Sequence, residues 1–231
     1  MRNPSPGRHG ARVLTLLALF LVAAGCRTRA QQAPPLTVLT QAPPRAVAQF
    51  PYDLRLRAEG GTPPLHWKLA GGTLPPGIEL DAEHGTLRGT PTSPGDFPLT
   101  LSVTDSETPP ATQSRAFLLK VVVPLELVWE KMPAVEGDRV LGSVEISNNA
   151  PVEIDLTLIV LAVNEYGKAF ALGYQHGPMP AQTQLQSFAF GSQMNLPRGR
   201  YVVHVDVVAE VAARQAIYRA RLQTSGALQV P

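Results

Sequence analysis

The chain has 231 residues, which is enough for about two small domains. Its 20 lysines and arginines nearly balance 18 aspartates and glutamates, and the basic residues form no run or stripe, so nothing indicates nucleic-acid binding. The single cysteine excludes an internal disulfide framework and any zinc site built from several cysteines.

The first residues have the pattern of a secretory signal peptide. Arg2, Arg8 and Arg12 form a basic leader, and an apolar run follows over residues 13–24. This run is shorter than the roughly 20 residues that span a bilayer, so it is typical of a signal sequence and not of a membrane helix.

The apolar run ends in Val22-Ala23-Ala24-Gly25-Cys26, which resembles a bacterial lipobox. In a lipobox the cysteine sulfur is lipidated before the chain is cut on the amino side of that cysteine. The resemblance implies a signal peptide over residues 1–25, a lipid attachment site at Cys26 that carries acyl chains such as palmitate, and a protein held at a membrane. Ordinary signal-peptidase cleavage nearby, without a lipid, is the alternative.

The residue after Cys26 bears on which membrane would hold the protein. Arg27 stands where an aspartate would resemble an inner-membrane retention signal of enteric bacteria. We therefore expect a lipid-anchored protein of the cell envelope, in the outer membrane of a Gram-negative bacterium. Residues 26–35 are polar, small and then proline-rich, and they are expected to form a tether.

Residues 36–124 alternate apolar and polar side chains in short runs that are bounded by glycine and proline turns. This period of two is typical of half-buried strands, and about seven strands in about 90 residues predict a β-sandwich. Trp67 lies in the middle of one such run, so the pattern favours core packing over a sugar-stacking role.

The segment Leu74–Pro91 reads Leu-Pro-Pro-Gly-Ile-Glu-Leu-Asp-Ala-Glu-His-Gly-Thr-Leu-Arg-Gly-Thr-Pro. Its prolines, Gly77 and Gly89 predict a small hairpin bracketed by turns. The pattern resembles the signature of the immunoglobulin-like domains of the He-PIG type in bacterial surface proteins. The resemblance covers roughly Gln49 to Val123 and implies an immunoglobulin-like, cadherin-like fold in a surface protein.

Residues 125–231 are expected to form a second immunoglobulin-like or fibronectin-like β-sandwich, joined to the first by a loose hinge at Pro124. The run Val152–Val163 has a polar face that becomes apolar, which predicts a strand in a covered sheet centre. Leu196-Pro197-Arg198-Gly199-Arg200-Tyr201 resembles the tyrosine corner of immunoglobulin and fibronectin type III sandwiches. The fold class is therefore all-β, with two sandwiches after a signal peptide.

No pattern of catalytic residues is present. The histidines beyond the leader are scattered, with no metal-ligand spacing and no serine motif around them: His66, His84, His176 and His204. We therefore expect the protein not to be an enzyme and to need no organic cofactor.

Calcium is the one metal that the sequence leaves open. Cadherin repeats hold calcium with loop carboxylates, so the resemblance makes Asp105 and Glu107 the candidate ligands. A calcium site needs about six to eight oxygen ligands, and no dense cluster of aspartates is present. The competing interpretation is a solvated turn in which Asp105 caps its own backbone.

The expected function is that of a non-enzymatic envelope lipoprotein whose sandwiches serve as adhesion, protein-binding or spacer modules. The partner is an envelope protein or a glycan. One alternative is an accessory glycan-binding module of a secreted enzyme, which would need a row of exposed aromatic rings supplied by Phe188, Phe190 and Tyr174. The other is calcium-dependent, cadherin-like adhesion.

Overall fold

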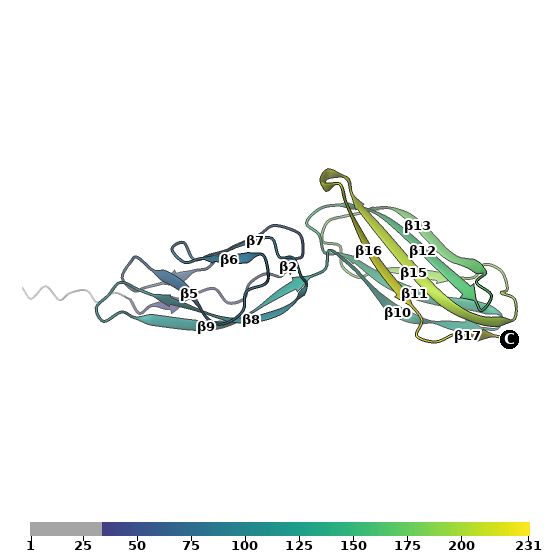
Figure 1. Ribbon diagram of the computed structural model, residues 1–231, viewed down its shortest axis with the longest axis horizontal. Helices are drawn as coiled ribbons and strands as arrows, with labels where there is room; N and C mark the ends of the chain where they lie inside the picture. Colours follow the sequence, from purple (N-terminus) through teal and green to yellow (C-terminus); the bar gives the residue numbers. More distant parts are fainter. Residues whose placement is uncertain (1–33) are drawn as a thin grey trace, which may run out of the picture. The chain divides into compact units, whose positions relative to one another are not determined.

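The computed structural model describes residues 34–231, and its regular elements are β-strands apart from one short 3₁₀ turn (Figure 1). The predicted signal peptide, Cys26 and nearly all of the tether lie outside the described residues. Within residues 34–231, no helix has the length and apolar character needed to cross a bilayer.

The N-terminal sandwich contains the first nine strands. They are β1 (Thr37–Val38), β2 (Ala46–Val47), β3 (Tyr52–Arg55), β4 (Ala58–Glu59), β5 (His66–Gly72), β6 (Ile78–Asp81), β7 (Thr86–Gly89), β8 (Gly95–Thr104) and β9 (Thr112–Val122). One sheet has the order β2-β9-β8-β5, a second has the order β3-β7-β6, and β1 pairs with β4. Most pairs are antiparallel, but β2 runs parallel to β9.

The core of this sandwich follows from the alternation in the sequence. Along β8, Leu99, Leu101 and Val103 point inward and are buried, and they meet buried side chains of the second sheet. Trp67 is also buried in this core, which confirms its predicted packing role.

The predicted hairpin is formed by β6 and β7, which pair antiparallel from Ile78 opposite Gly89 to Asp81 opposite Thr86. Gly77 and Gly89 have φ values of 89° and 138°, in the region that favours glycine. They face each other closely, because a Cβ on Gly89 would overlap the carbonyl oxygen of Gly77. Because they have no Cβ, these glycines allow the two chains to approach closely at the end of the hairpin opposite its turn.

The C-terminal sandwich contains the remaining strands and a single 3₁₀ turn. They are β10 (Leu125–Glu136), β11 (Arg139–Asn148), β12 (Ile154–Asn164), β13 (Ala169–Met179), β14 (Gln186–Gly191), β15 (Gly199–Val211), η1 (Ala212–Arg214), β16 (Ala216–Gln223) and β17 (Leu228–Val230). One sheet has the order β10-β11-β14. The other has the order β13-β12-β15-β16, with β17 also paired to β15.

The predicted tyrosine corner is present at the start of β15. Tyr201 is fully buried, its ring meets that of Phe170 edge-on at 5.8 Å, and its hydroxyl reaches the backbone of Pro197. Leu196 is buried in the same core. Among the described residues every strand pairing falls either within 37–122 or within 125–230, and each part has its own hydrophobic core.

One expectation about β12 was wrong. The outer face of this strand becomes apolar, and the sequence pattern predicted that another layer would cover it. The structure places β12 in the centre of its sheet, between β13 and β15, but Ile159 on its outer face is 38% exposed. The apolar outer face is therefore open to solvent within the described part of the chain.

Candidate functional site

The four histidines lie on separate elements and do not converge. His66 is in β5, His84 is in the turn between β6 and β7, His176 is in β13 and His204 is in β15. Over residues 34–231, no group of three histidine, cysteine, aspartate or glutamate side chains is placed to hold a metal ion.

His84 belongs to a polar cluster around Asp81. The Asp81 carboxylate accepts hydrogen bonds from the backbone amides of Glu83 and His84, and it lies 3.0 Å from Nδ1 of His84 and 3.8 Å from Arg88. The amide of His84 is the main reason why the pKa of Asp81 is lowered from its ordinary value. The cluster lies at the surface, and the amide hydrogen bonds to Asp81 stabilise the turn between β6 and β7.

Asp105 is 4% exposed and caps the loop between β8 and β9. One carboxylate oxygen accepts from the amides of Ala111, at 2.7 Å, and Glu107, and the other accepts from Thr62 at 3.1 Å. The backbone hydrogen bond from Thr62 is the main reason why its pKa lies below the ordinary value. Both oxygens are thus engaged by loop amides, an arrangement that matches the capping interpretation. Glu107 is exposed.

The three aromatic residues considered for glycan binding do not share a face. Phe188 and Phe190 are buried in the core of the C-terminal sandwich, where the ring of Phe190 lies 6.3 Å from that of Trp129. Tyr174 is 69% exposed on β13. A row of exposed rings is therefore not formed by these residues.

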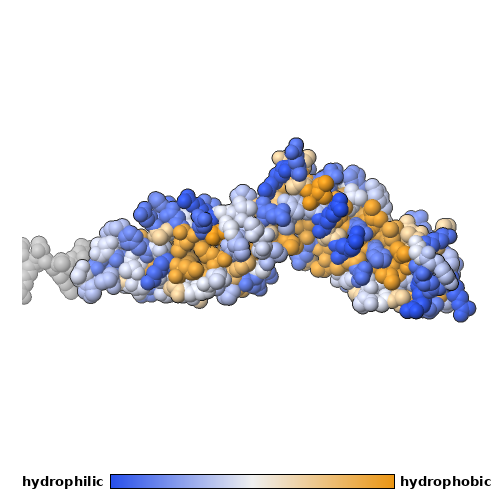
Figure 2. All heavy atoms as spheres, viewed as in Figure 1, coloured by the Kyte–Doolittle hydropathy of each residue, from blue (hydrophilic) through white to orange (hydrophobic). Residues whose placement is uncertain are grey.

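The most distinctive surface is the outer face of the sheet β13-β12-β15-β16. Its centre is aliphatic, and we call the set Ile159, Leu161, Tyr174 and Val208 the outer apolar stripe. Ile159 lies between Tyr174 of β13 and Asp206 of β15 in the strand register. Figure 2 shows apolar surface, in orange, in the region where Figure 1 labels β12, β13 and β15.

The alternation of β12 explains the stripe. Leu158, Val160 and Ala162 point into the core and are buried, so Ile159 and Leu161 must point outward. A hollow of about 540 Å³ lies over these residues and extends to Val208. Aliphatic side chains on both faces of a strand would suit a covered sheet, but here the outer layer is missing among the described residues.

Charged side chains border the stripe. Arg221 of β16 forms an ion pair with Asp206 of β15, which it faces in the register, and Arg219 lines the same hollow. Toward the other end of the sheet, His176 lies 3.1 Å from the hydroxyl of Thr157 and 3.6 Å from Asp155. An apolar centre with a polar border of both signs is the usual pattern of a protein-binding surface.

The sequence contained the signal for this surface, but its interpretation needed the structure. The run of β12 showed that both faces become apolar, whereas only the sheet order shows which face remains uncovered.

Comparisons with known proteins support the fold of the N-terminal sandwich. Residues 34–122 match the family model described as Putative Ig domain, He_PIG. No curated protein matches the sequence.

Solved structures show partial similarity. Protocadherin gamma B7, in its extracellular cadherin domains 1–4, is 10% identical, with 85% of this chain and 49% of that chain covered and a TM-score of 0.37. The alpha-2-macroglobulin of Escherichia coli is 10% identical, with 85% and 22% covered and a TM-score of 0.36. A putative alpha-galactosidase of Bacteroides fragilis is 21% identical, with 38% and 17% covered and a TM-score of 0.31. The chain thus spans less than a fifth of that enzyme and about half of the protocadherin.

Proposed function

We propose that this protein is a non-enzymatic lipoprotein of the cell envelope that binds another protein, because residues 34–122 match the family model described as Putative Ig domain. In this proposal the lipid on Cys26 anchors the chain, the N-terminal sandwich acts as a spacer, and the outer apolar stripe carries the binding surface. The observation that carries the proposal is the exposed stripe over β12, at whose centre Ile159 is 38% exposed.

The chemistry of the stripe favours a protein partner over a glycan. Its centre is aliphatic, and Tyr174 supplies its single exposed ring. Burying aliphatic surface gives a favourable free energy of roughly 25 cal/mol per Å² against any apolar partner, without the stacked rings that sugars require. The border contains the Asp206–Arg221 ion pair and Arg219, which forms no salt bridge within residues 34–231. The proposed partner is therefore a protein surface with an apolar centre and charges of both signs.

The proposed location follows from the amino-terminal sequence. A lipidated cysteine with several acyl chains gives durable membrane attachment, because each buried methylene contributes about 0.8 kcal/mol. With Arg27 after Cys26, the proposed membrane is the outer membrane of a Gram-negative bacterium.

Site-specific photo-crosslinking in living cells tests the binding surface. A photoreactive residue at position 159 or 174 of the full chain is expected to give one discrete adduct. The same residue at position 118 is a matched control, because Leu118 is 54% exposed on β9 of the other sandwich. Leu161→Glu should abolish the adduct at 159, and Leu118→Glu should leave it unchanged.

Three results would count against the proposal. Equal adducts from positions 159 and 118 would indicate non-specific contact, and no adduct from 159 or 174 would remove the surface from consideration. Binding of the purified chain to glycans in a manner that Tyr174→Ala abolishes, without a protein adduct, would favour the glycan-binding alternative.

A further inference from the structure

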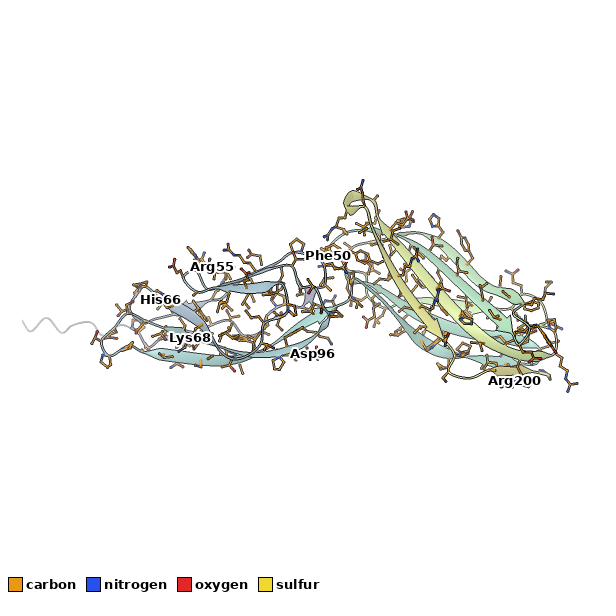
Figure 3. All side chains as sticks on the ribbon, viewed as in Figure 1. Phe50, Arg55, His66, Lys68, Asp96 and Arg200 are labelled. Carbon is orange, nitrogen blue, oxygen red and sulfur yellow. The ribbon has the colours of Figure 1, made fainter. Side chains whose placement is uncertain are left out.

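Phe50 is buried, at 3% exposure, but it belongs to neither hydrophobic core. It lies between β2 and β3, at one end of the N-terminal sandwich (Figure 3). Its ring packs 6.1 Å from the ring of Tyr218 in β16, and the guanidinium of Arg214 lies over its face at 4.2 Å from the ring centroid. Both of these ring contacts of Phe50 thus come from the C-terminal sandwich.

The backbone around Phe50 is held firmly by its own sandwich. Gln49 adopts a φ of 66°, which is uncommon for a residue with a side chain, and its amide donates to the carbonyl of Pro91 at 2.7 Å. The amides of Ala48 and Phe50 donate to Val122 and Val47. The carbonyl of Gln49 is left to accept from Arg214, at 2.8 Å, so Arg214 contacts both the ring and the backbone of this turn.

A second set of contacts begins at Arg45, five residues before Phe50 in the chain. Arg45 donates to the side-chain oxygen of Gln184, in the loop between β13 and β14, at 3.1 Å. Gln184 donates to Asn149, and the side-chain amide of Asn149 donates to the carbonyl of Val123 at 3.0 Å. The backbone amide of Asn149 donates to Pro124 at 2.8 Å. Val123 and Pro124, which link the two sandwiches, are therefore hydrogen-bonded to the C-terminal sandwich.

We infer that the segment Arg45–Phe50 is a docking element that fixes the two sandwiches into one rigid joint. Three attachments act together: Phe50 with Arg214 and Tyr218, Arg45 with Gln184, and the linker carbonyls with Asn149. One flexible linker permits rotation, whereas attachments at separate points remove it. The described residues 34–231 are not divided into separate compact units, and this arrangement differs from the loose hinge expected at Pro124.

The joint extends the proposed function without depending on it. A rigid joint would hold the outer apolar stripe at a constant orientation to the N-terminal sandwich, whatever molecule binds there. The cation–π contact of Arg214 with Phe50 is the part most accessible to mutation, because Arg214 is exposed and its replacement leaves both cores intact.

Distance measurements between two spin labels test the joint. Cys26→Ser removes the only cysteine, after which Leu118→Cys and Tyr166→Cys introduce one exposed label site on each sandwich. The full chain with these labels is expected to give a narrow distance distribution. Arg214→Ala, alone and combined with Phe50→Ala, should widen the distribution at least two-fold. Arg219→Ala is the matched control, because it removes an exposed arginine from β16, the strand that follows Arg214. The distance distribution of this variant should stay narrow.

Two results would contradict the rigid joint. A broad distribution in the labelled parent chain would overturn the joint, as would an unchanged narrow distribution in the Arg214→Ala variant. If the Phe50→Ala protein does not fold, the distance distribution of the Arg214→Ala variant still tests the joint, because this substitution preserves both cores. The labels are read without any partner present, so the result is independent of the crosslinking test.

Discussion

The hydroxyl of Tyr201 donates a hydrogen bond to the carbonyl oxygen of Pro197, 2.7 Å away and four residues upstream. The bond closes the corner at which the chain enters β15, the strand that pairs with β12, β16 and β17. Because Tyr201 is fully buried, its hydroxyl has no access to water and depends on this one acceptor. The corner therefore fixes the register of the central strand of the sheet that carries the outer apolar stripe.

Tyr201→Phe should destabilise the C-terminal sandwich by about 1 kcal/mol, because it removes the hydrogen bond while the ring still packs against Phe170. Urea denaturation followed by near-ultraviolet circular dichroism measures the loss. Tyr174→Phe is the control, since the ring of Tyr174 is exposed, and it should leave the midpoint unchanged. Equal midpoints for Tyr201→Phe and the parent would show that the corner does not contribute to stability.

The corner could be predicted because its residues are neighbours in the sequence. The same holds for the β6–β7 hairpin, whose turn residues lie within one segment, and for the buried face of β8, where alternation alone assigns Leu99, Leu101 and Val103 to the core. In each case the local pattern contains the information that determines the structure.

Features that depend on distant parts of the chain could not be predicted in this way. No local pattern around Phe50 indicates that it packs against Tyr218 and Arg214, because both residues lie far along the sequence. Likewise the pattern of β12 shows apolar side chains on both faces, but only the tertiary structure shows that no other layer of residues 34–231 covers Ile159. The alternation of apolar residues indicates which side chains tend to be buried, whereas the tertiary structure determines which residues pack against them.

Alkaline pH should destabilise the N-terminal sandwich. Burial raises the pKa of Tyr52 from 10.0 to about 12, and its hydroxyl donates to Pro44. Since the folded pKa exceeds the unfolded value, the contribution to stability is complete below pH 10 and is lost as the pH rises toward 12. We expect a loss on the order of 1–2 kcal/mol, after allowance for partial solvent access. Urea titrations at several pH values measure it, and Tyr52→Phe should flatten the dependence. A parent chain equally stable at pH 9 and pH 11 would contradict the prediction.

Gly77→Val and Gly89→Val should each destabilise the N-terminal sandwich, by on the order of 1–3 kcal/mol from the backbone conformation alone. Overlap adds to this loss, because a Cβ on Gly77 would meet the carbonyl of Thr90 and one on Gly89 would meet that of Gly77. Thermal melts measure the effect. Gly226→Val provides the comparison, since open space surrounds that position, and it should melt like the parent. Unchanged melts for the two hairpin variants would refute this account of the hairpin.

Calcium is expected to leave the melting temperature of the chain unchanged, because the loop amides of Thr62, Glu107 and Ala111 engage both carboxylate oxygens of Asp105. Melts with a chelator and with millimolar calcium chloride should coincide. A rise of several degrees with calcium, abolished by Asp105→Ala, would instead favour a cadherin-like site.

Acid should remove the contribution of Asp105. Its folded pKa is lowered, so the stabilisation is present above the ordinary carboxyl pKa of about 4 and is lost as the pH falls below it. Asp105→Asn should lower the melting temperature at neutral pH and reduce its decline between pH 5 and pH 2. Glu107→Gln is the matched control, because this side chain is exposed, and it should change neither quantity. An acid profile that is identical in the Asp105→Asn variant and the parent would show that another carboxylate is responsible.

Membrane attachment should depend on the sulfur of Cys26, because the proposed anchor is a lipid joined to that sulfur through a thioether. Cys26→Ser removes that atom while keeping a small side chain at the predicted cleavage site. In fractionated cells the parent should remain in the membrane pellet after a high-salt wash, whereas the variant should be recovered in the soluble fraction. Metabolic labelling with an alkyne-tagged palmitate analogue should mark the parent alone. Arg27→Lys, which keeps the positive charge beside the cysteine, should behave like the parent in both measurements. Retention of Cys26→Ser in the washed membrane at the level of the parent, without label, would mean that the protein is held there by another contact.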